Sequence, residues 1–111
     1  MSYFIESVAG AARFSAEKMT KNNLAEGSHL TLGLNCFEPG QKHATHAHAA
    51  SDKAYYVVSG EGRFDVAGEE QQLGAGALVF APAGIPHGVI NTGSERLVLL
   101  VTIAPPIQKK G

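Results

Sequence analysis

Three histidines are the residues of this 111-residue chain whose spacing suggests chemistry. His46 and His48 are one residue apart, and side chains alternate between the faces of a β-strand. Their imidazoles would therefore point the same way from Cα atoms roughly 7 Å apart. Two imidazoles at that separation can share one metal ion if a third ligand comes from another part of the chain. His87 is the candidate, because it follows a segment that Pro82 and Pro86 stiffen.

Glycine, proline and other fixed residue types frame the three histidines at regular intervals, over residues 40–60 and residues 76–91. The fixed positions are, in chain order, Gly40, His46, His48, Lys53 and Gly60, then Gly76, Pro82, Gly84, His87 and Asn91. The three glycines Gly40, Gly60 and Gly76 fall where strands must reverse, and there a residue free to take a positive φ relieves strain. The two frames resemble the signature motifs of the cupin superfamily, small β-barrels that usually bind a divalent metal. The family's first motif has a metal-binding Glu where this chain has Lys53.

This resemblance implies an all-β cupin jelly-roll, the double-stranded β-helix, with residues 1–111 forming a single antiparallel barrel domain of the small conserved-barrel type. It implies a divalent metal ion held by His46, His48 and His87, with iron, manganese, zinc and nickel all open. Three neutral imidazoles leave up to three positions on such an ion for water, oxygen or substrate. Cupins without the carboxylate, such as some thiol and diketone dioxygenases, resemble this arrangement. Others are isomerases, decarboxylases, storage proteins or sensors, so the fold alone does not fix the activity.

Lys53 and Tyr55 are the candidate catalytic residues, because they would share one face of the strand that follows the first frame. An inward Lys53 would put a cation beside a divalent ion. That requires loss of its proton, a swing of its flexible stem to solvent, or weak metal binding. If it does point inward, we expect Lys53 to orient an anionic group of the substrate. Tyr55 either lines the same pocket or is an aromatic of the core. Asp52 could supply a carboxylate if the loop shifted by one residue.

Other chemically capable residues have structural interpretations. His43 lies three positions before His46, off the strand alternation, and is expected to be an exposed loop histidine. His29 is interpreted as a strand-edge residue. Cys36 alternates with leucines and has no base nearby in the sequence, which favours a packed thiol over a nucleophile. Asn91 is expected to cap a turn.

Short β-rich segments separated by turn residues extend over most of the chain. We expect strands at residues 29–37 (half-buried), 54–59, 62–73 (a hairpin closing near Ala67 and Gly68), 77–81 (buried), 87–91 and 96–104. Residues 1–28 are compatible with either a short helix or an irregular strand. With no amphipathic helix between the strands, the pattern predicts an antiparallel barrel or sandwich of six to eight strands.

Composition and charge limit the partners. Net charge is -1 and the nine Lys and Arg residues are scattered, which argues against nucleic acid and favours a small molecule. No apolar leader or membrane segment is evident. With Cys36 as the only cysteine, we expect a cytoplasmic protein. The small core and the many strand edges predict a homodimer.

We therefore expect a metal-dependent enzyme that acts on a small polar or aromatic molecule, with oxygenation ahead of isomerisation. The same cavity could instead serve a non-catalytic binding or sensory module, with or without metal. A third interpretation is a structural dimer that retains a vestigial metal site.

Overall fold

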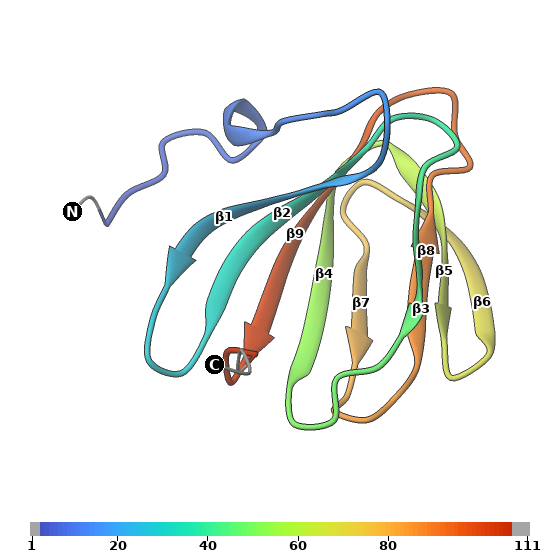
Figure 1. The fold of residues 1–111 in the computed structure, drawn as a ribbon. Coiled ribbons are helices and arrows are strands. Elements are labelled where there is room, and N and C mark those ends of the chain that lie inside the picture. Colours follow the sequence, from blue (N-terminus) through green and yellow to red (C-terminus); the bar gives the residue numbers. More distant parts are fainter. Residues whose placement is uncertain (1–2, 108–111) are drawn as a thin grey trace.

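The computed structural model describes residues 3–107 and is built from two antiparallel sheets (Figure 1). One sheet has five strands in the order β1-β2-β9-β4-β7, and the other has four in the order β3-β8-β5-β6. The strands are β1 (Thr20–Glu26), β2 (Thr31–Phe37), β3 (Lys42–His46), β4 (Asp52–Ser59), β5 (Glu61–Val66), β6 (Glu69–Gly74), β7 (Leu78–Ala81), β8 (His87–Ile90) and β9 (Leu97–Ala104). The predicted all-β jelly-roll class is confirmed.

The described residues contain nine strands, so the prediction of six to eight was too low. Two of the strands, β1 and β3, lie at sheet edges and carry mostly polar residues, which conceals the period-2 apolar signal of a strand. The predicted hairpin is confirmed, because β5 and β6 are joined by Ala67 and Gly68 at φ 55° and 84°. The domain prediction spans residues 1–111, of which the first two and last four lie outside the described residues.

The main core lies between the two sheets and is built from alternate residues of the strands. Its buried members are Phe37, Tyr55, Val57, Phe64, Val79, Val89, Leu97, Leu99 and Val101. Alternation is clearest in β4, where Lys53, Tyr55 and Val57 are buried and face this interior. In the described part of the chain, no helix has the length and apolar character needed to cross a bilayer.

A second cluster covers the outer face of the five-stranded sheet. Leu34, Cys36 and Val98 are buried there beneath the N-terminal segment, which contributes Val8, Ala11, Ala12 and Phe14 and includes the short 3-10 helix η1 (Ala9–Ala11). The later part of β2 is therefore buried on both faces, and the expectation of a half-buried strand was wrong. The packed-thiol interpretation of Cys36 is confirmed, and burial raises the pKa of its thiol.

The outer face is bare at the other edge of the same sheet. Leu78 and Phe80 on β7 are 69% and 56% exposed, and Tyr56 on the adjoining strand β4 is 45% exposed. The expectation of a buried strand at residues 77–81 was wrong, because β7 is an edge strand with only Val79 and Ala81 facing inward. This apolar edge face has no cover among the described residues.

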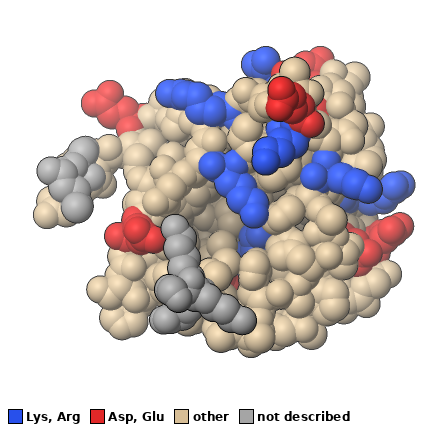
Figure 2. Space-filling view, viewed as in Figure 1, with Lys and Arg blue, Asp and Glu red and all other residues tan. Residues whose placement is uncertain are grey.

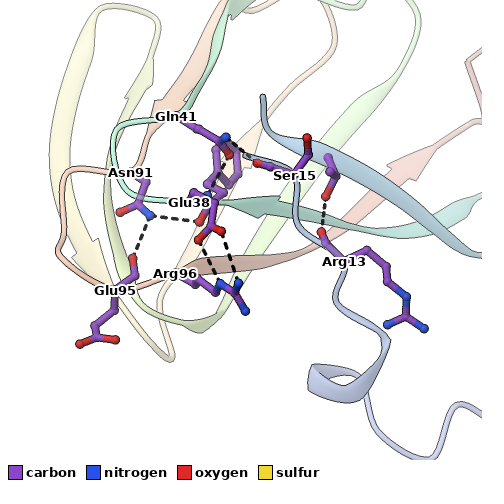
Figure 3. Close-up of polar contacts among 9 residues, drawn as sticks. Arg13, Ser15, Glu38, Gln41, Asn91, Glu95 and Arg96 are labelled. Atoms are coloured by element: carbon purple, nitrogen blue, oxygen red, sulfur yellow. Dashed lines mark hydrogen bonds and ion pairs between the residues drawn. The ribbon is translucent and has the colours of Figure 1, made fainter. Parts of the chain in front are cut away.

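One end of the barrel, here called the closed end, comprises the connections from β2 to β3 and from β8 to β9. The Asn91 side chain donates from Nδ2 to the carbonyl oxygens of Phe37 and Glu95, at 3.2 Å and 2.9 Å. Its Oδ1 accepts from the backbone N–H of Gly93 at 3.0 Å. Asn91 thus caps the turn as predicted and also links the two connections (Figure 3).

Further hydrogen bonds tie the N-terminal segment to the closed end (Figure 3). Gln41 Nε2 donates to the carbonyl oxygen of Ser15 at 2.7 Å, and its Oε1 accepts from the Glu38 backbone N–H at 2.8 Å. Arg96 forms an ion pair with Glu38 at 3.0 Å across the two connections. The closed end is therefore held by a continuous set of partnered polar groups.

Candidate metal centre

The opposite end of the barrel, here called the open end, brings the three histidines together. His46 is the last residue of β3 and His87 the first of β8, and the two are direct neighbours in the sheet. Their ring centroids are 4.3 Å apart, and that of His48 lies 4.9 Å from His46 and 5.8 Å from His87. One ring nitrogen from each histidine can be chosen so that all three lie within 4.8 Å of one another.

Hydrogen bonds orient two of these imidazoles. Nδ1 of His46 lies 2.8 Å from the carbonyl oxygen of Ala44, and Nδ1 of His87 lies 2.9 Å from that of Ile85. A carbonyl only accepts, so each Nδ1 carries the proton and each Nε2 keeps its lone pair. Both Nε2 atoms are buried without a hydrogen-bond partner. Buried acceptors of this kind, oriented through the other ring nitrogen, fit a divalent metal ion.

A β-bulge brings His46 to the interior. His43 pairs with Val89 and His46 with His87, so three steps along β3 match two along β8. Gly88 makes room for the extra residue, since a Cβ there would lie 2.9 Å from Thr45 Oγ1 and 3.1 Å from its Cα. The bulge turns both His43 and His46 toward the core side of the sheet, because Val89 and His87 both face inward.

The expectation of an exposed loop histidine at His43 was wrong for this reason. His43 is half-buried on β3, its ring centroid is 4.1 Å from that of His46, and its buried Nδ1 has no hydrogen-bond partner. Burial and, next, the charge of Lys21 lower its pKa to about 3. Alternation along the sequence assigns His43 to the wrong face, because the extra residue of a bulge reverses which residues of the strand point inward.

His48 reaches the site by a different route from the one expected. Strand β3 ends at His46, so strand alternation does not place His48. The loop is instead fixed by the backbone, where the N–H of Gly84 donates to the carbonyl oxygen of His48 at 2.8 Å. This bond ties the loop after β3 to the proline-stiffened loop before β8.

At the position of the family's usual Glu, Lys53 points inward. Its side chain is 3% exposed and its Nζ lies 4.9 Å from the centroid of the Tyr55 ring. Tyr55 belongs to the core and also borders the histidines, with its ring centroid 6.2 Å from that of His87. Asp52 is exposed and accepts a hydrogen bond from the backbone N–H of Ala83, so its carboxylate does not replace the missing Glu. His29 is exposed in the turn between β1 and β2, not at a strand edge.

Burial sets the protonation of the open end. It lowers the pKa of His48 to about 4, and it lowers those of His46 and His87 although their Nδ1 hydrogen bonds oppose the shift. All three imidazoles are therefore neutral at neutral pH, as metal binding requires. Burial and, next, the charge of Lys21 lower the pKa of Lys53 from 10.5 to about 8. Burial also raises the pKa of Tyr55, so its hydroxyl stays protonated.

Comparison with known proteins agrees with this architecture. Residues 33–103 match the family model described as Cupin domain. The crystal structure of TT1209 from Thermus thermophilus is 40% identical, has a TM-score of 0.87, and is matched over 91% of this chain and 96% of that chain. An RmlC-like cupin from Desulfovibrio desulfuricans is 29% identical with a TM-score of 0.78, over 96% and 97%. The uncharacterized protein SCO3923 of Streptomyces coelicolor is 35% identical over 77 residues, 69% of this chain and 71% of that protein.

Proposed function

This chain belongs to the cupin domain family, and from that premise we propose that it is a metal-dependent enzyme acting on a small polar or aromatic molecule, with oxygenation ahead of isomerisation. The observation that carries the proposal is the convergence of His46, His48 and His87 at the open end, with two buried Nε2 atoms that lack partners. A divalent ion held there would supply Lewis acidity and, if redox-active, electron transfer to oxygen.

The surrounding residues support a chemical role. Lys53 and Tyr55 lie on the same face of β4 as the buried core, beside the histidines, and both side chains end in hydrogen-bond donors. In this proposal Lys53 orients an anionic group of the substrate, and the protonated hydroxyl of Tyr55 donates a hydrogen bond to it. Three neutral imidazoles leave more coordination positions open than three imidazoles and a carboxylate would.

The cation at Lys53 also favours a second candidate, a non-catalytic binding or sensory module. An ammonium beside the histidines repels a divalent ion, and the chain lacks the Glu whose carboxylate would neutralise the charge of that ion. Such a module would bind a small ligand through the same residues, with the metal weakly held or not needed.

Oxygen uptake separates the two candidates. The full chain is loaded anaerobically with iron(II), mixed with a panel of small organic acids and phenols, and exposed to oxygen in an electrode cell. We expect uptake with at least one compound, its loss in His48→Ala, and its retention in His29→Ala, which removes an exposed turn histidine. Bound iron without uptake for any compound would favour the binding module.

We also propose that the partner protein is a second copy of this chain. The apolar edge face, formed by Tyr56, Leu78 and Phe80, is bare, whereas Leu34, Cys36 and Val98 on the same outer face are covered by the N-terminal segment. A second copy would cover this face with its own apolar edge face. Light scattering should give about twice the chain mass of 11.6 kDa, and Phe80→Ser should lower it. A wild-type mass near 11.6 kDa would exclude the dimer.

The remaining parts of the proposal concern the ligand and the compartment. The net charge of -1 supports a small-molecule ligand in place of nucleic acid or a membrane. The single buried thiol, Cys36, suits the reducing environment of the cytoplasm, which stays a prediction.

A further inference from the structure

Three buried side chains on the core side of the five-stranded sheet end in donors that have no acceptor. Asn35, Lys53 and Tyr55 are 5%, 3% and 1% exposed. The Asn35 Nδ2 and the Tyr55 hydroxyl have no hydrogen-bond partner. Among residues 3–107, Lys53 forms no ion pair or hydrogen bond, and its Nζ lies 4.9 Å from the centroid of the Tyr55 ring. Unsatisfied buried donors are rare in folded proteins, and a buried ammonium without a counter-charge is costly.

Cations gather between the two sheets, at the edges formed by β1 and β3. A hollow of about 590 Å³ between the start of β1 and β3 is lined by Lys18, Lys21 and Lys42, together with His43. In Figure 2, Lys and Arg side chains cluster over the middle of this face of the molecule. The ion pair found in the described part of the chain joins Arg96 to Glu38, so none of these lysines is paired with a carboxylate there.

From Lys21 a second hollow extends toward the neighbours of Lys53. Lys21 also lines a hollow of about 200 Å³ along the inner face of the sheet, which Val101 and Ile103 border. These two residues are the direct β9 neighbours of Tyr55 and Lys53. The charge that acts on the Lys53 ammonium is that of Lys21, with no carboxylate opposing it. The chain as a whole carries a net charge of -1, so the positive opening does not follow from overall composition.

We propose that this site takes a small organic anion, whose carboxylate or phosphate group is held by Lys53 and the Tyr55 hydroxyl after entry past Lys21. The anion supplies the counter-charge that Lys53 lacks and an acceptor for the Tyr55 hydroxyl. Lysines at the opening raise the local concentration of anions and speed their entry. The inference rests on the proposed function, because it names the substrate class of the same site, but this contact does not itself require the metal.

Calorimetric titration of the full, metal-free chain with malonate and with inorganic phosphate tests the inference. We expect at least one anion to bind at millimolar concentration or below, and the stronger of the two identifies the group that the site prefers. Lys53→Met, which keeps most of the unbranched stem and removes the charge, should weaken binding about tenfold or more. Lys21→Gln should weaken it less, because Lys21 lies at the exposed entrance.

Two controls make the result specific. Arg63→Gln removes a positive charge from the outward face of the four-stranded sheet and should leave anion affinity unchanged. Malonamide, the neutral analogue of malonate, should not bind. The inference is overturned if neither anion binds, if malonamide binds as well as malonate, or if Lys53→Met or Arg63→Gln behaves otherwise than stated.

Repeating the titrations with manganese-loaded protein separates this inference from the proposed function. A chain that binds manganese but neither anion overturns the anion site and leaves the metal proposal intact. A chain that binds malonate or phosphate through Lys53 but takes up none of manganese, iron(II), zinc and nickel supports the anion site and removes the metal-dependent enzyme.

Discussion

The closed and open ends of this barrel are built on the same strands but treat their buried polar atoms in opposite ways. At the closed end, both polar atoms of the buried Asn91 side chain have partners. At the open end, His46 Nε2, His87 Nε2 and the Tyr55 hydroxyl are buried without any. Strand β8 connects the two, since His87 begins it and Asn91 directly follows it. One end therefore serves stability, and the other retains unpartnered groups for a ligand.

The largest effect is expected at the closed end. Asn91→Ala removes three hydrogen bonds, two of which are donated to the carbonyls of Phe37 and Glu95. We expect the free energy of unfolding to fall by about 3 kcal/mol in urea titrations, with metal binding per folded chain unchanged. Asn23→Ala, the same change on the exposed side of β1, should cost less than about 0.5 kcal/mol. Equal losses in the two variants would show that the closed end is not the stabilising one.

A smaller effect, in the opposite direction, is expected from restoring the family's carboxylate. Lys53→Glu removes the ammonium and adds a ligand beside the histidines, so divalent affinity should rise by about tenfold. Oxygen-dependent turnover should fall, because one open position is then occupied. Manganese titrations under anaerobic conditions measure the change, with Lys42→Glu at the solvent-facing opening as the charge-matched control. Unchanged affinity in Lys53→Glu would mean that position 53 does not act on the metal.

A third effect is a dependence of stability on acid that originates at the open end. Burial holds the pKa of His48 at about 4 and that of His43 at about 3, below the 6.5 of an unfolded histidine. At a pH between the folded and the unfolded pKa values, the unfolded chain binds more protons than the folded chain. Stability is therefore full above about pH 6.5 and falls as the pH falls toward 4. Urea midpoints of the metal-free protein at about pH 7 and about pH 4.5 measure the loss. His43→Gln should reduce it, and an unchanged loss in that variant would contradict the assignment.

The sequence predicted the features that depend on spacing and on residue chemistry. The two frames indicated the jelly-roll, and the glycines expected at strand reversals have φ values of 86° at Gly40, 81° at Gly60 and 92° at Gly76. In each frame, glycine, histidine and the other fixed residue types stand at set distances from one another along the chain. Signals of this kind survive because they depend on local backbone geometry.

What the sequence could not give depends on contacts between distant segments. The bulge in β3 requires the partner residue Gly88, which lies far along the chain, so His43 was assigned the wrong face. The inward orientation of Lys53 was left open because its stem is long enough to reach solvent from either face. The cover over Cys36 comes from an N-terminal segment that has no regular apolar pattern. In each case tertiary contacts outweighed local periodicity.

Metal content measured on protein purified without chelator or affinity nickel tests the central claim most directly. His48 is the best position to change, because it lies in a loop and its loss leaves both strands and the core intact. The account predicts about one divalent ion per wild-type chain, loss of most of it in His48→Ala, and full occupancy in His29→Ala, where an exposed turn histidine is removed. A His48→Ala protein that keeps its full complement of metal would contradict the account.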